Sequence, residues 1–222
     1  MGRSPKLEAM EQLRQEYASC TSCYLDKYRT QVVFGGGDLD AKLLVIGEGP
    51  GKQEDRQGET WVGVSGLCLN AALAECGLGR AEVWTTNRVL CIPKTAHGSV
   101  ESPGAGPLLA CMHRLLSEIY IVDPRVILTL GKTAIQMLTG ASNLKMGTAA
   151  GKQFSLKFDG NMLPVEYPAI ATWHPSYLLR NGELSVGADG KSVEVTGPVG
   201  KEWLQHIQHA VRLANLPRSF AA

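Results

Sequence analysis

Long apolar runs are missing from this 222-residue chain, and none approaches the roughly 18 residues that a membrane-spanning helix needs. The N-terminal segment is polar and lacks the apolar stretch of a secretory signal peptide. We therefore expect an intracellular, cytoplasmic protein without a membrane partner. Disulfides are rare in that compartment, so the six cysteines point to another use.

An excess of charge of one sign is missing as well. The chain has 22 Lys and Arg against 21 Asp and Glu, a net charge of +1, and so gives no overall basic signal for nucleic acid. Any nucleic-acid partner would have to be held by a local patch. Hydrophobic residues make up 44% and charged residues 19%, which is typical of a globular protein, and the length favours a single domain over residues 1–222.

Four short apolar runs rich in β-branched residues have the composition of strands buried on both faces. They cover residues 41–47, 81–87, 125–131 and 168–174. Helical patterns separate or flank these runs, at residues 5–18, 64–76, 106–123, 131–140 and 201–215. The alternation predicts an α/β fold: a three-layer α/β/α sandwich around a central, mainly parallel sheet of four strands.

Two further segments have neither pattern. Residues 91–107 are rich in Pro, Gly and Ser, which predicts a loop. Residues 185–197 contain Asp189-Gly190 between polar and β-branched residues, which predicts a hairpin inserted after the fourth strand.

The segment GEGPG, residues 47–51, follows the first predicted strand directly. In parallel α/β sheets ligands bind at the carboxyl ends of the strands, and glycines such as Gly49 let the backbone approach a ligand closely. Glu48 would place a carboxylate there, as a general base or to stabilise a developing cation. Trp61 would offer a flat face for stacking. Taken alone, the motif fits a solvated, glycine-rich surface loop equally well.

Nucleotide-binding loops of the common types are missing too. GEGPG is neither a Walker loop nor G-x-G-x-x-G. Gly131-Lys132-Thr133 follows the third predicted strand, but Val126 stands where a Walker motif needs its first glycine. We therefore do not interpret this segment as a phosphate-binding loop.

Four of the cysteines lie outside the predicted core. Cys20 and Cys23 form a C-x2-C pair, and two thiols so close usually bind a metal. Cys91 and Cys111 flank the predicted loop. Four thiolates can hold zinc or a [4Fe–4S] cluster. A zinc ribbon more often has two C-x2-C pairs, so the wide spacing of the second pair favours the cluster and leaves zinc as the alternative.

The segment TWHPSYLLR, residues 172–180, follows the fourth predicted strand, again at the carboxyl edge. The proline after His174 holds this histidine in a fixed direction, where it can donate a hydrogen bond to a developing anion. Ser176 and Arg180 can bind phosphates. A purely structural role is the alternative for a single histidine at a strand end.

Asn87 ends the second predicted strand. Its amide can present a donor and an acceptor side by side to the edge of a base. Three strand ends therefore bring Glu48, Asn87 and His174 to one crevice, and this convergence favours a functional interpretation of each.

Taken together, these motifs resemble the uracil-DNA glycosylase superfamily, most closely its iron–sulfur family 4 enzymes. The resemblance covers nearly the whole chain and rests on the order and spacing of C-x2-C, GEGPG with the following ED, WVGVSG, TNRVLC, the fourth cysteine, RVILTLG and HPSYLLR. It implies that the cluster ligands are Cys20, Cys23, Cys91 and Cys111. The cluster would fasten the N-terminal helix to the 91–107 loop.

The resemblance also implies an activity, the hydrolysis of the N-glycosidic bond of uracil in DNA, as in base excision repair. The target nucleotide would be flipped out of the stack, with Trp61 stacking on its base and Asn87 reading its edge. His174 would face the pyrimidine O2 and stabilise the charge that grows on the base, while Glu48 would stabilise the charge on the sugar. Arg180 would close the loop that contacts DNA.

Two alternatives stay open. Trp61 stands where the family usually has phenylalanine, which changes the floor of the base pocket and allows a glycosylase for another modified base. A non-catalytic DNA-binding or polymerase-associated module of the same fold is the other alternative. The family branch that cross-links itself to DNA has a basic insertion that this chain lacks. We expect a monomer that binds DNA, and is thereby associated with the nucleoid, without covalent trapping.

Overall fold

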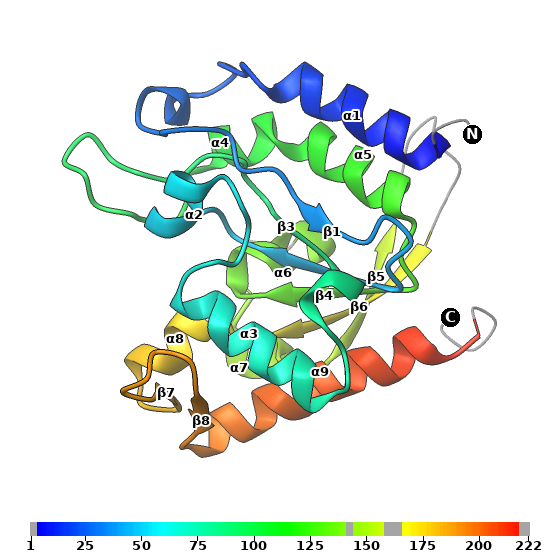
Figure 1. Cartoon of the computed structure of the whole chain (residues 1–222), viewed down its shortest axis with the longest axis vertical. Helices are drawn as coiled ribbons and strands as arrows, with labels where there is room; N and C mark the ends of the chain where they lie inside the picture. The colour runs from blue at the N-terminus through cyan, green and yellow to red at the C-terminus, as the bar shows by residue number, and fades with distance from the viewer. Residues whose placement is uncertain (1–3, 141–143, 158–165, 218–222) are drawn as a thin grey trace.

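Six strands form one sheet through the centre of the computed structural model, which describes residues 4–140, 144–157 and 166–217 (Figure 1). The strands lie in the order β1-β3-β2-β4-β6-β5. Neighbours among β3, β2, β4 and β6 are parallel, and β1 and β5 pair antiparallel at the two edges. Their bounds are β1 Gly36–Gly37, β2 Leu43–Gly47, β3 Trp84–Asn87, β4 Val126–Leu130, β5 Gln153–Lys157 and β6 Glu166–Thr172.

The four apolar runs correspond to the four parallel strands, so the predicted α/β fold with a mainly parallel sheet is confirmed. The predicted number of four strands is wrong, because the described part of the chain adds one strand at each edge. β1 consists of two glycines, and β5 has only two apolar residues in alternation. Both are held by main-chain pairing with a single neighbour, which leaves little trace in a sequence pattern.

Side chains of the parallel strands alternate between two buried faces, as strands covered on both sides require. Leu43 and Val45 of β2 pack against α3 (Val64–Glu75) and α9 (Pro198–Asn215). The intervening Leu44 and Ile46 pack on the opposite face, whose helices are α1 Pro5–Tyr17, α5 Met112–Val122 and α6 Lys132–Thr139. Figure 1 shows α1 and α5 above the sheet and α3 and α9 below it, which is the predicted three-layer arrangement.

Some helix boundaries differ from the predicted ones. The helical pattern 106–123 is interrupted at Cys111 and forms α4 (Ala105–Ala110) and α5. No helix is predicted where the polar helix α2 (Lys52–Gln57) lies, because six polar residues carry no apolar period. The remaining short elements are η1 Tyr24–Lys27, η2 Arg80–Glu82, α7 Met146–Ala149 and α8 Pro175–Arg180. Within the described ranges no helix is both long enough and apolar enough to cross a membrane.

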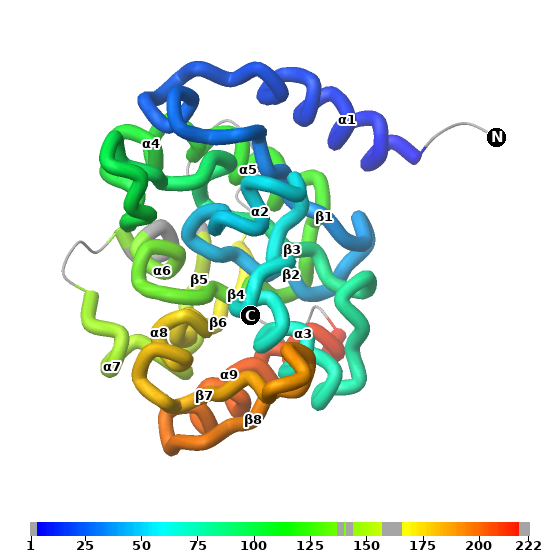
Figure 2. Tube along the Cα trace, turned by 60° about the vertical axis from the view of Figure 1, so that its left-hand side comes forward, coloured from blue at the N-terminus to red at the C-terminus, as the bar shows by residue number. Residues whose placement is uncertain are grey.

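The predicted hairpin is present as β7 (Leu184–Val186) paired with β8 (Val193–Val195). It lies beside α8 and the start of α9 (Figure 2). Glu183, which precedes the hairpin, accepts hydrogen bonds at 2.9 and 3.1 Å from two backbone N–H groups in the first turn of α9. Leu184 is buried in the core. The hairpin is thus packed against the sandwich.

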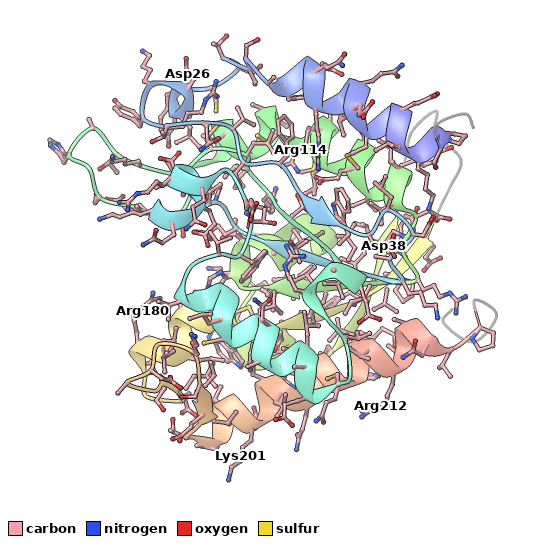
Figure 3. The ribbon with its side chains drawn as sticks, viewed as in Figure 1. Asp26, Asp38, Arg114, Arg180, Lys201 and Arg212 are labelled. Carbon is pink, nitrogen blue, oxygen red and sulfur yellow. The ribbon has the colours of Figure 1, made fainter. Side chains whose placement is uncertain are left out.

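A buried ion pair fastens α5 to the sheet. Arg114 and Glu118 stand one turn apart on α5, are 0% and 2% exposed, and lie 2.6 Å apart from Nη1 to Oε2. Glu118 also accepts hydrogen bonds from Trp84 at 2.9 Å and from Thr86 at 2.8 Å, both in β3. Through Nη2, Arg114 donates to the backbone oxygen of Asn87 at 2.7 Å. The pair therefore holds the carboxyl end of β3 in place; Arg114 is labelled in Figure 3.

Replacing Arg114 with leucine should strongly destabilise the protein. The substitution leaves the carboxylate of Glu118 buried without its cation, and breaking a buried pair in this way costs about 3–5 kcal/mol. The free energy of unfolding, from equilibrium urea denaturation, measures the loss. The matched control is Arg212→Leu on the exposed side of α9, which should stay within about 0.5 kcal/mol of wild type. Equal losses in the two variants would contradict the assignment.

Candidate active site

A cavity of about 610 Å³ opens at the carboxyl ends of the parallel strands. β2 leads into it through Glu48, β3 through Asn87, β4 through Gly131 and β6 through His174. The structure thus brings together around one cavity all seven site residues predicted outside the cysteines: Glu48, Gly49, Trp61, Asn87, His174, Ser176 and Arg180.

Glu48 and Asn87 are placed side by side by main-chain pairing. Gly47 and Asn87 are partners in the parallel register of β2 and β3. The pairing continues beyond the strands: the backbone N–H of Arg88 donates to the backbone oxygen of Gly47 at 3.0 Å, and the backbone N–H of Val89 donates to that of Glu48 at 3.2 Å. Asn87 itself is 4% exposed. The base-reading candidate is therefore held rigidly at the bottom of the cavity.

Trp61 forms a wall of this cavity in an unusual backbone conformation. Its φ is +61°, in the left-handed region, where a bulky side chain costs about 1–3 kcal/mol. The indole is 6% exposed and stacks on the ring of His174, with centroids 5.5 Å apart and planes 28° apart. A Cβ at Gly47 would lie 2.8 Å from the indole and would also overlap the amide of Asn87. Only glycine fits there, which explains the first glycine of GEGPG.

His174 caps the N-terminus of α8, and the ring is held by Ser176. Its Nδ1 accepts a hydrogen bond from the backbone N–H of Ser176 at 3.2 Å and lies 2.8 Å from the Ser176 hydroxyl. Burial lowers the pKa of His174 to about 4, and the positive charge of Arg180 acts in the same direction. The ring is therefore neutral near pH 7. Because Nδ1 accepts, Nε2 carries the hydrogen and is the donor of the neutral ring.

Glu48 is held by two hydroxyl groups that the sequence analysis does not identify. Thr133, in the first turn of α6, donates to Oε2 of the carboxylate. Ser102, in the segment before α4, donates to the same oxygen at 3.3 Å. Thr133 lies shortly after the end of a strand, and this position in the sequence is the feature that could have indicated it as a site residue. Ser102 gives no such signal.

Two acidic residues of the loop after Glu48 have structural roles. Glu54 accepts hydrogen bonds from the backbone N–H groups of Gly51 at 3.1 Å and Gly63 at 2.7 Å, and so ties the start of α2 to the start of α3. Asp55 is buried and accepts from the backbone N–H of Thr30 at 2.9 Å. These bonds explain why a polar helix forms where no apolar period predicts one.

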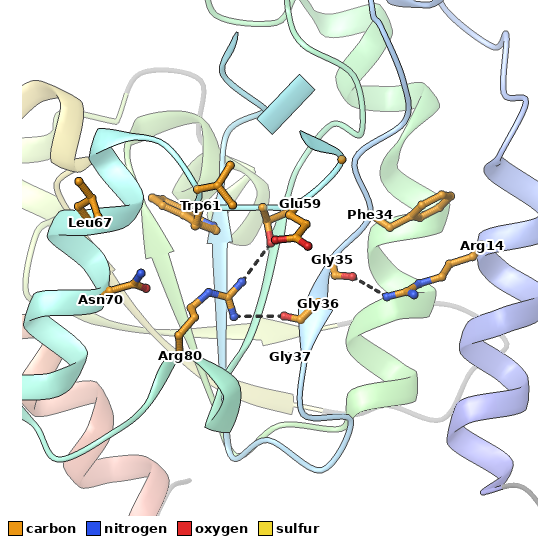
Figure 4. A pocket seen from close by; sticks show the side chains of 13 residues that line it. Arg14, Phe34, Gly35, Gly36, Gly37, Glu59, Trp61, Leu67, Asn70 and Arg80 are labelled. Carbon is orange, nitrogen blue, oxygen red and sulfur yellow. Dashed lines mark hydrogen bonds between the residues drawn. The ribbon is translucent and has the colours of Figure 1, made fainter. Parts of the chain in front are cut away.

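A second cavity of about 590 Å³ shares Trp61 with the first (Figure 4). Its lining includes two arginines, Arg14 and Arg80, together with Glu59. Figure 4 shows both guanidinium groups directed at the β1 segment, where Arg14 donates to the oxygen of Gly35 at 2.8 Å. Arg80 donates to the next backbone oxygen at 3.4 Å. The arginines thus hold the edge strand β1.

The four cysteines predicted as cluster ligands are near one another, but two of them are buried in the core rather than outside it. Cys91 and Cys111 are buried in one apolar cluster, and Cys23 packs against it. Burial raises the pKa of Cys91 to about 11, and the nearby thiols of Cys111 and Cys23 add to the shift. Burial likewise raises the pKa of Cys23, with contributions from Cys111 and Cys20. Over the described residues, no three His, Cys, Asp or Glu side chains are placed so that they could hold a metal ion.

A mainly parallel α/β sheet with a carboxylate, an amide and a neutral imidazole around one cavity at its carboxyl edge is the architecture of a ligand-binding enzyme site. Residues 34–192 match the family model of the Uracil DNA glycosylase superfamily, and the chain belongs to this superfamily. All seven predicted site residues around the first cavity lie within the matched segment.

The following three proteins are among the curated relatives of this chain that carry the name Type-4 uracil-DNA glycosylase. The protein from Thermotoga maritima is 38% identical over 179 residues, which cover 78% of this chain and 85% of that protein. The protein from Pyrobaculum aerophilum is 32% identical over 178 residues, covering 79% and 87%. The protein from Saccharolobus solfataricus is 32% identical over 176 residues, covering 76% and 80%.

His174 should remain neutral down to about pH 4 in the folded protein, and this should make stability depend on pH. In the unfolded chain the ring takes up a proton near its ordinary pKa of 6.5, but in the folded chain only near 4. Unfolding is then coupled to proton uptake between these values, so the contribution of this ring lowers stability as the pH falls through the window. Urea denaturation at pH 7 and pH 5 measures the effect.

The control for this prediction is His174→Gln, which has no titrating ring at the same position. Wild type should lose more stability than the variant between pH 7 and pH 5. In an NMR experiment on the imidazole nitrogens at pH 7, wild type should show the neutral Nε2–H form. Equal pH dependence of the two proteins would show that burial does not shift this pKa.

Proposed function

We propose that this protein hydrolyses the N-glycosidic bond of uracil in DNA, the first step in base excision repair of deaminated cytosine. The observation that carries the proposal is the convergence of Glu48, Asn87 and His174 on one cavity with an aromatic wall. Membership of the superfamily and the names of the curated relatives support the same reaction.

The base would enter the cavity as a flipped nucleotide, because its glycosidic bond is out of reach inside a duplex. Trp61 would stack on the base. The buried amide of Asn87 would read the base edge, since it offers a donor and an acceptor side by side. The glycines of the GEGPG loop, Gly49 among them, would let the backbone approach the base and the sugar.

The bond between C1′ of the sugar and N1 of the base breaks with its electron pair moving to the base. Negative charge then grows on the base oxygen, where the Nε2–H of neutral His174 would stabilise it. Positive charge grows on the sugar, where the carboxylate of Glu48 would stabilise it and orient the attacking water. The water oxygen bonds to C1′, and the departing base finally takes up a proton.

DNA would be held by local contacts rather than by the overall charge, which is only +1. Ser176 and Arg180 stand at the beginning and end of α8, on the rim of the cavity, and would bind phosphates. Lys52 and Lys132 line the same cavity and add positive charge. Acting as a monomer inside the cell, the protein would thus bind the strand that carries the damaged base.

A [4Fe–4S] cluster would be held by Cys20, Cys23, Cys91 and Cys111, with zinc as the less favoured alternative. The chemistry of the donor set supports the assignment, because Cys23, Cys91 and Cys111 pack in one apolar cluster, Cys20 lies near Cys23, and buried thiolates need a compensating cation. In the described part of the chain these side chains do not yet converge on one point, so the thiols would have to reorient to hold the cluster. When bound, the cluster would supply positively charged iron that pairs these thiolates and ties together distant segments. The hydrolysis described above uses no redox chemistry.

A glycosylase for another modified base is the second candidate, and Trp61 favours it. The indole is wider than the phenylalanine ring usual in the family, and it stacks on His174. The shape of the pocket floor therefore differs from the family pattern, which can change the preferred base.

Single-turnover excision with excess enzyme tests the function. Uracil-containing single- and double-stranded oligonucleotides should lose the base, and alkaline cleavage of the abasic product measures the rate. Glu48→Gln and His174→Ala should each slow release about a hundred- to a thousandfold, since each removes a contact to charge that appears in the transition state. Their affinity for DNA should change little.

Matched controls are Glu59→Gln, which removes another acid near the same loop, and His113→Ala, which removes an exposed histidine. Both should excise uracil at the wild-type rate. Oligonucleotides with other damaged bases belong in the same experiment. Release of another base instead of uracil would support the second candidate, and binding without release of any base would support a non-catalytic module.

The cluster assignment predicts iron and acid-labile sulfide in equal amounts after anaerobic purification, with a broad visible absorption. Cys20→Ser should lose the iron and much of the stability. Cys76→Ser is the control, because this thiol at the C-terminal end of α3 packs against the core, so the substitution should leave the iron content unchanged. Stoichiometric zinc without iron in the wild-type protein would overturn the cluster in favour of the alternative.

A further inference from the structure

The segment Gly131-Lys132-Thr133, which is not a phosphate loop, forms the first turn of α6 between two of the proposed catalytic residues. On one side, the Thr133 hydroxyl donates to the carboxylate of Glu48. On the other side, a Cβ at Gly131 would lie 3.2 Å from the Cβ of His174, and Gly131 has a φ of +94°. The absence of a side chain at Gly131 therefore lets α6 start in contact with both.

Thr133 is itself held firmly. It is 8% exposed, and its backbone oxygen accepts a hydrogen bond from the guanidinium of Arg88 at 2.8 Å. Arg88 is buried and directly follows Asn87 at the end of β3. Burial lowers the pKa of Arg88, and the carboxylate of Glu48 opposes this shift, so the cation also faces Glu48. The hydroxyl of Thr133 thus comes from a rigid part of the cavity wall.

We propose that Thr133 is a positioning residue for Glu48, an inference that rests on the proposed glycosylase function. Both hydrogen bonds that the Glu48 side chain makes within the described chain end on Oε2. Holding Oε2 fixes the rotation of the carboxylate and leaves Oε1 for the sugar and the attacking water. A glutamate side chain has three rotatable bonds, so without this bond its carboxylate would reach the reacting position only part of the time.

The two hydroxyl donors should not contribute equally. Thr133 is buried and fixed through Arg88, whereas Ser102 is exposed and its bond to Glu48 is 3.3 Å long. Water can replace the Ser102 hydroxyl but not a hydroxyl inside the wall. We therefore expect the order of importance Thr133 before Ser102.

The test compares Thr133→Val, which has nearly the same shape and no hydroxyl, with Thr133→Ser, which keeps the hydroxyl. Single-turnover uracil excision should fall about tenfold to a hundredfold in Thr133→Val, the size expected from misplacing a reacting group. Thr133→Ser should retain most of the rate, and Ser102→Ala should fall less than Thr133→Val. Affinity for uracil-containing DNA, measured by fluorescence anisotropy, should be unchanged in all three. Thr133→Ala serves as a second variant without the hydroxyl in case valine prevents folding.

Two comparisons separate positioning from a general structural effect. Thr129→Val removes another buried threonine hydroxyl, which donates to the backbone oxygen of Ile170 at 3.4 Å. Thr129 does not line the cavity, so this variant should excise uracil at the wild-type rate. In a Glu48→Gln background, Thr133→Val should cost little further rate, because the carboxylate it positions is gone.

Three results would overturn the role of Thr133: a wild-type rate in the valine and alanine variants, a loss in Thr133→Ser equal to that in Thr133→Val, or a full additional loss in the Glu48→Gln background. Each of these leaves uracil excision by the wild-type protein intact. Failure of the wild-type protein to release uracil would instead reject the proposed function, so the two failures are distinguishable.

Discussion

The guanidinium of Arg114, fully shielded from water, fixes the end of β3 and with it the geometry of the cavity. Taking a charge out of water is costly, and here the cost is offset by the Glu118 carboxylate and by bonds to the backbone oxygens of Asn87 and Arg88. Those oxygens lie at the carboxyl end of β3, where Asn87 pairs with Gly47 of β2 and the backbone N–H of Arg88 donates to the oxygen of Gly47. The network therefore adds side-chain hydrogen bonds to the backbone pairing at the point where the Asn87 side chain begins.

The residues around the cavity pack closely on one another, beginning with Asn87 at the end of β3. The amide of Asn87 approaches the backbone of Gly47, and the indole of Trp61 covers the same glycine. Trp61 has a left-handed backbone conformation, and its indole stacks on the ring of His174. The guanidinium of Arg88 donates a hydrogen bond to the backbone oxygen of Thr133 in α6, and the hydroxyl of Thr133 donates to Glu48. A change of side-chain volume at any of these contacts would shift the neighbouring side chains, because the interior is closely packed.

The electrostatic environments of Glu48 and His174 differ in a way that suits opposite tasks. Burial and Arg180 keep His174 neutral, so the ring can donate a hydrogen bond without bringing a full charge into the cavity. Glu48 accepts hydrogen bonds from the hydroxyl groups of Thr133 and Ser102, which hold its side chain at the cavity. A bond that separates charge as it breaks would thus meet a neutral donor on the side that becomes negative and an anion on the side that becomes positive.

The sequence by itself determined the layers and the strand ends. Apolar runs buried on both faces can only be parallel strands with helices on either side, and Glu48, Asn87 and His174 follow such runs directly. The edge strands β1 and β5 were not predicted, because they are held by main-chain pairing with one neighbour rather than by an apolar period. The polar helix α2 was not predicted either, because it is held by hydrogen bonds to Glu54 and Asp55.

Only the tertiary structure decided which distant groups complete the site. Thr133 and Glu48 are 85 positions apart, and the hydroxyl reaches the carboxylate because β2 and β4 are neighbours in the sheet. The neutral state of His174 and its stacking on Trp61 likewise arise from burial and packing between segments. Local patterns record the period of a strand or helix, whereas protonation and side-chain contacts depend on what the folded chain places opposite each residue.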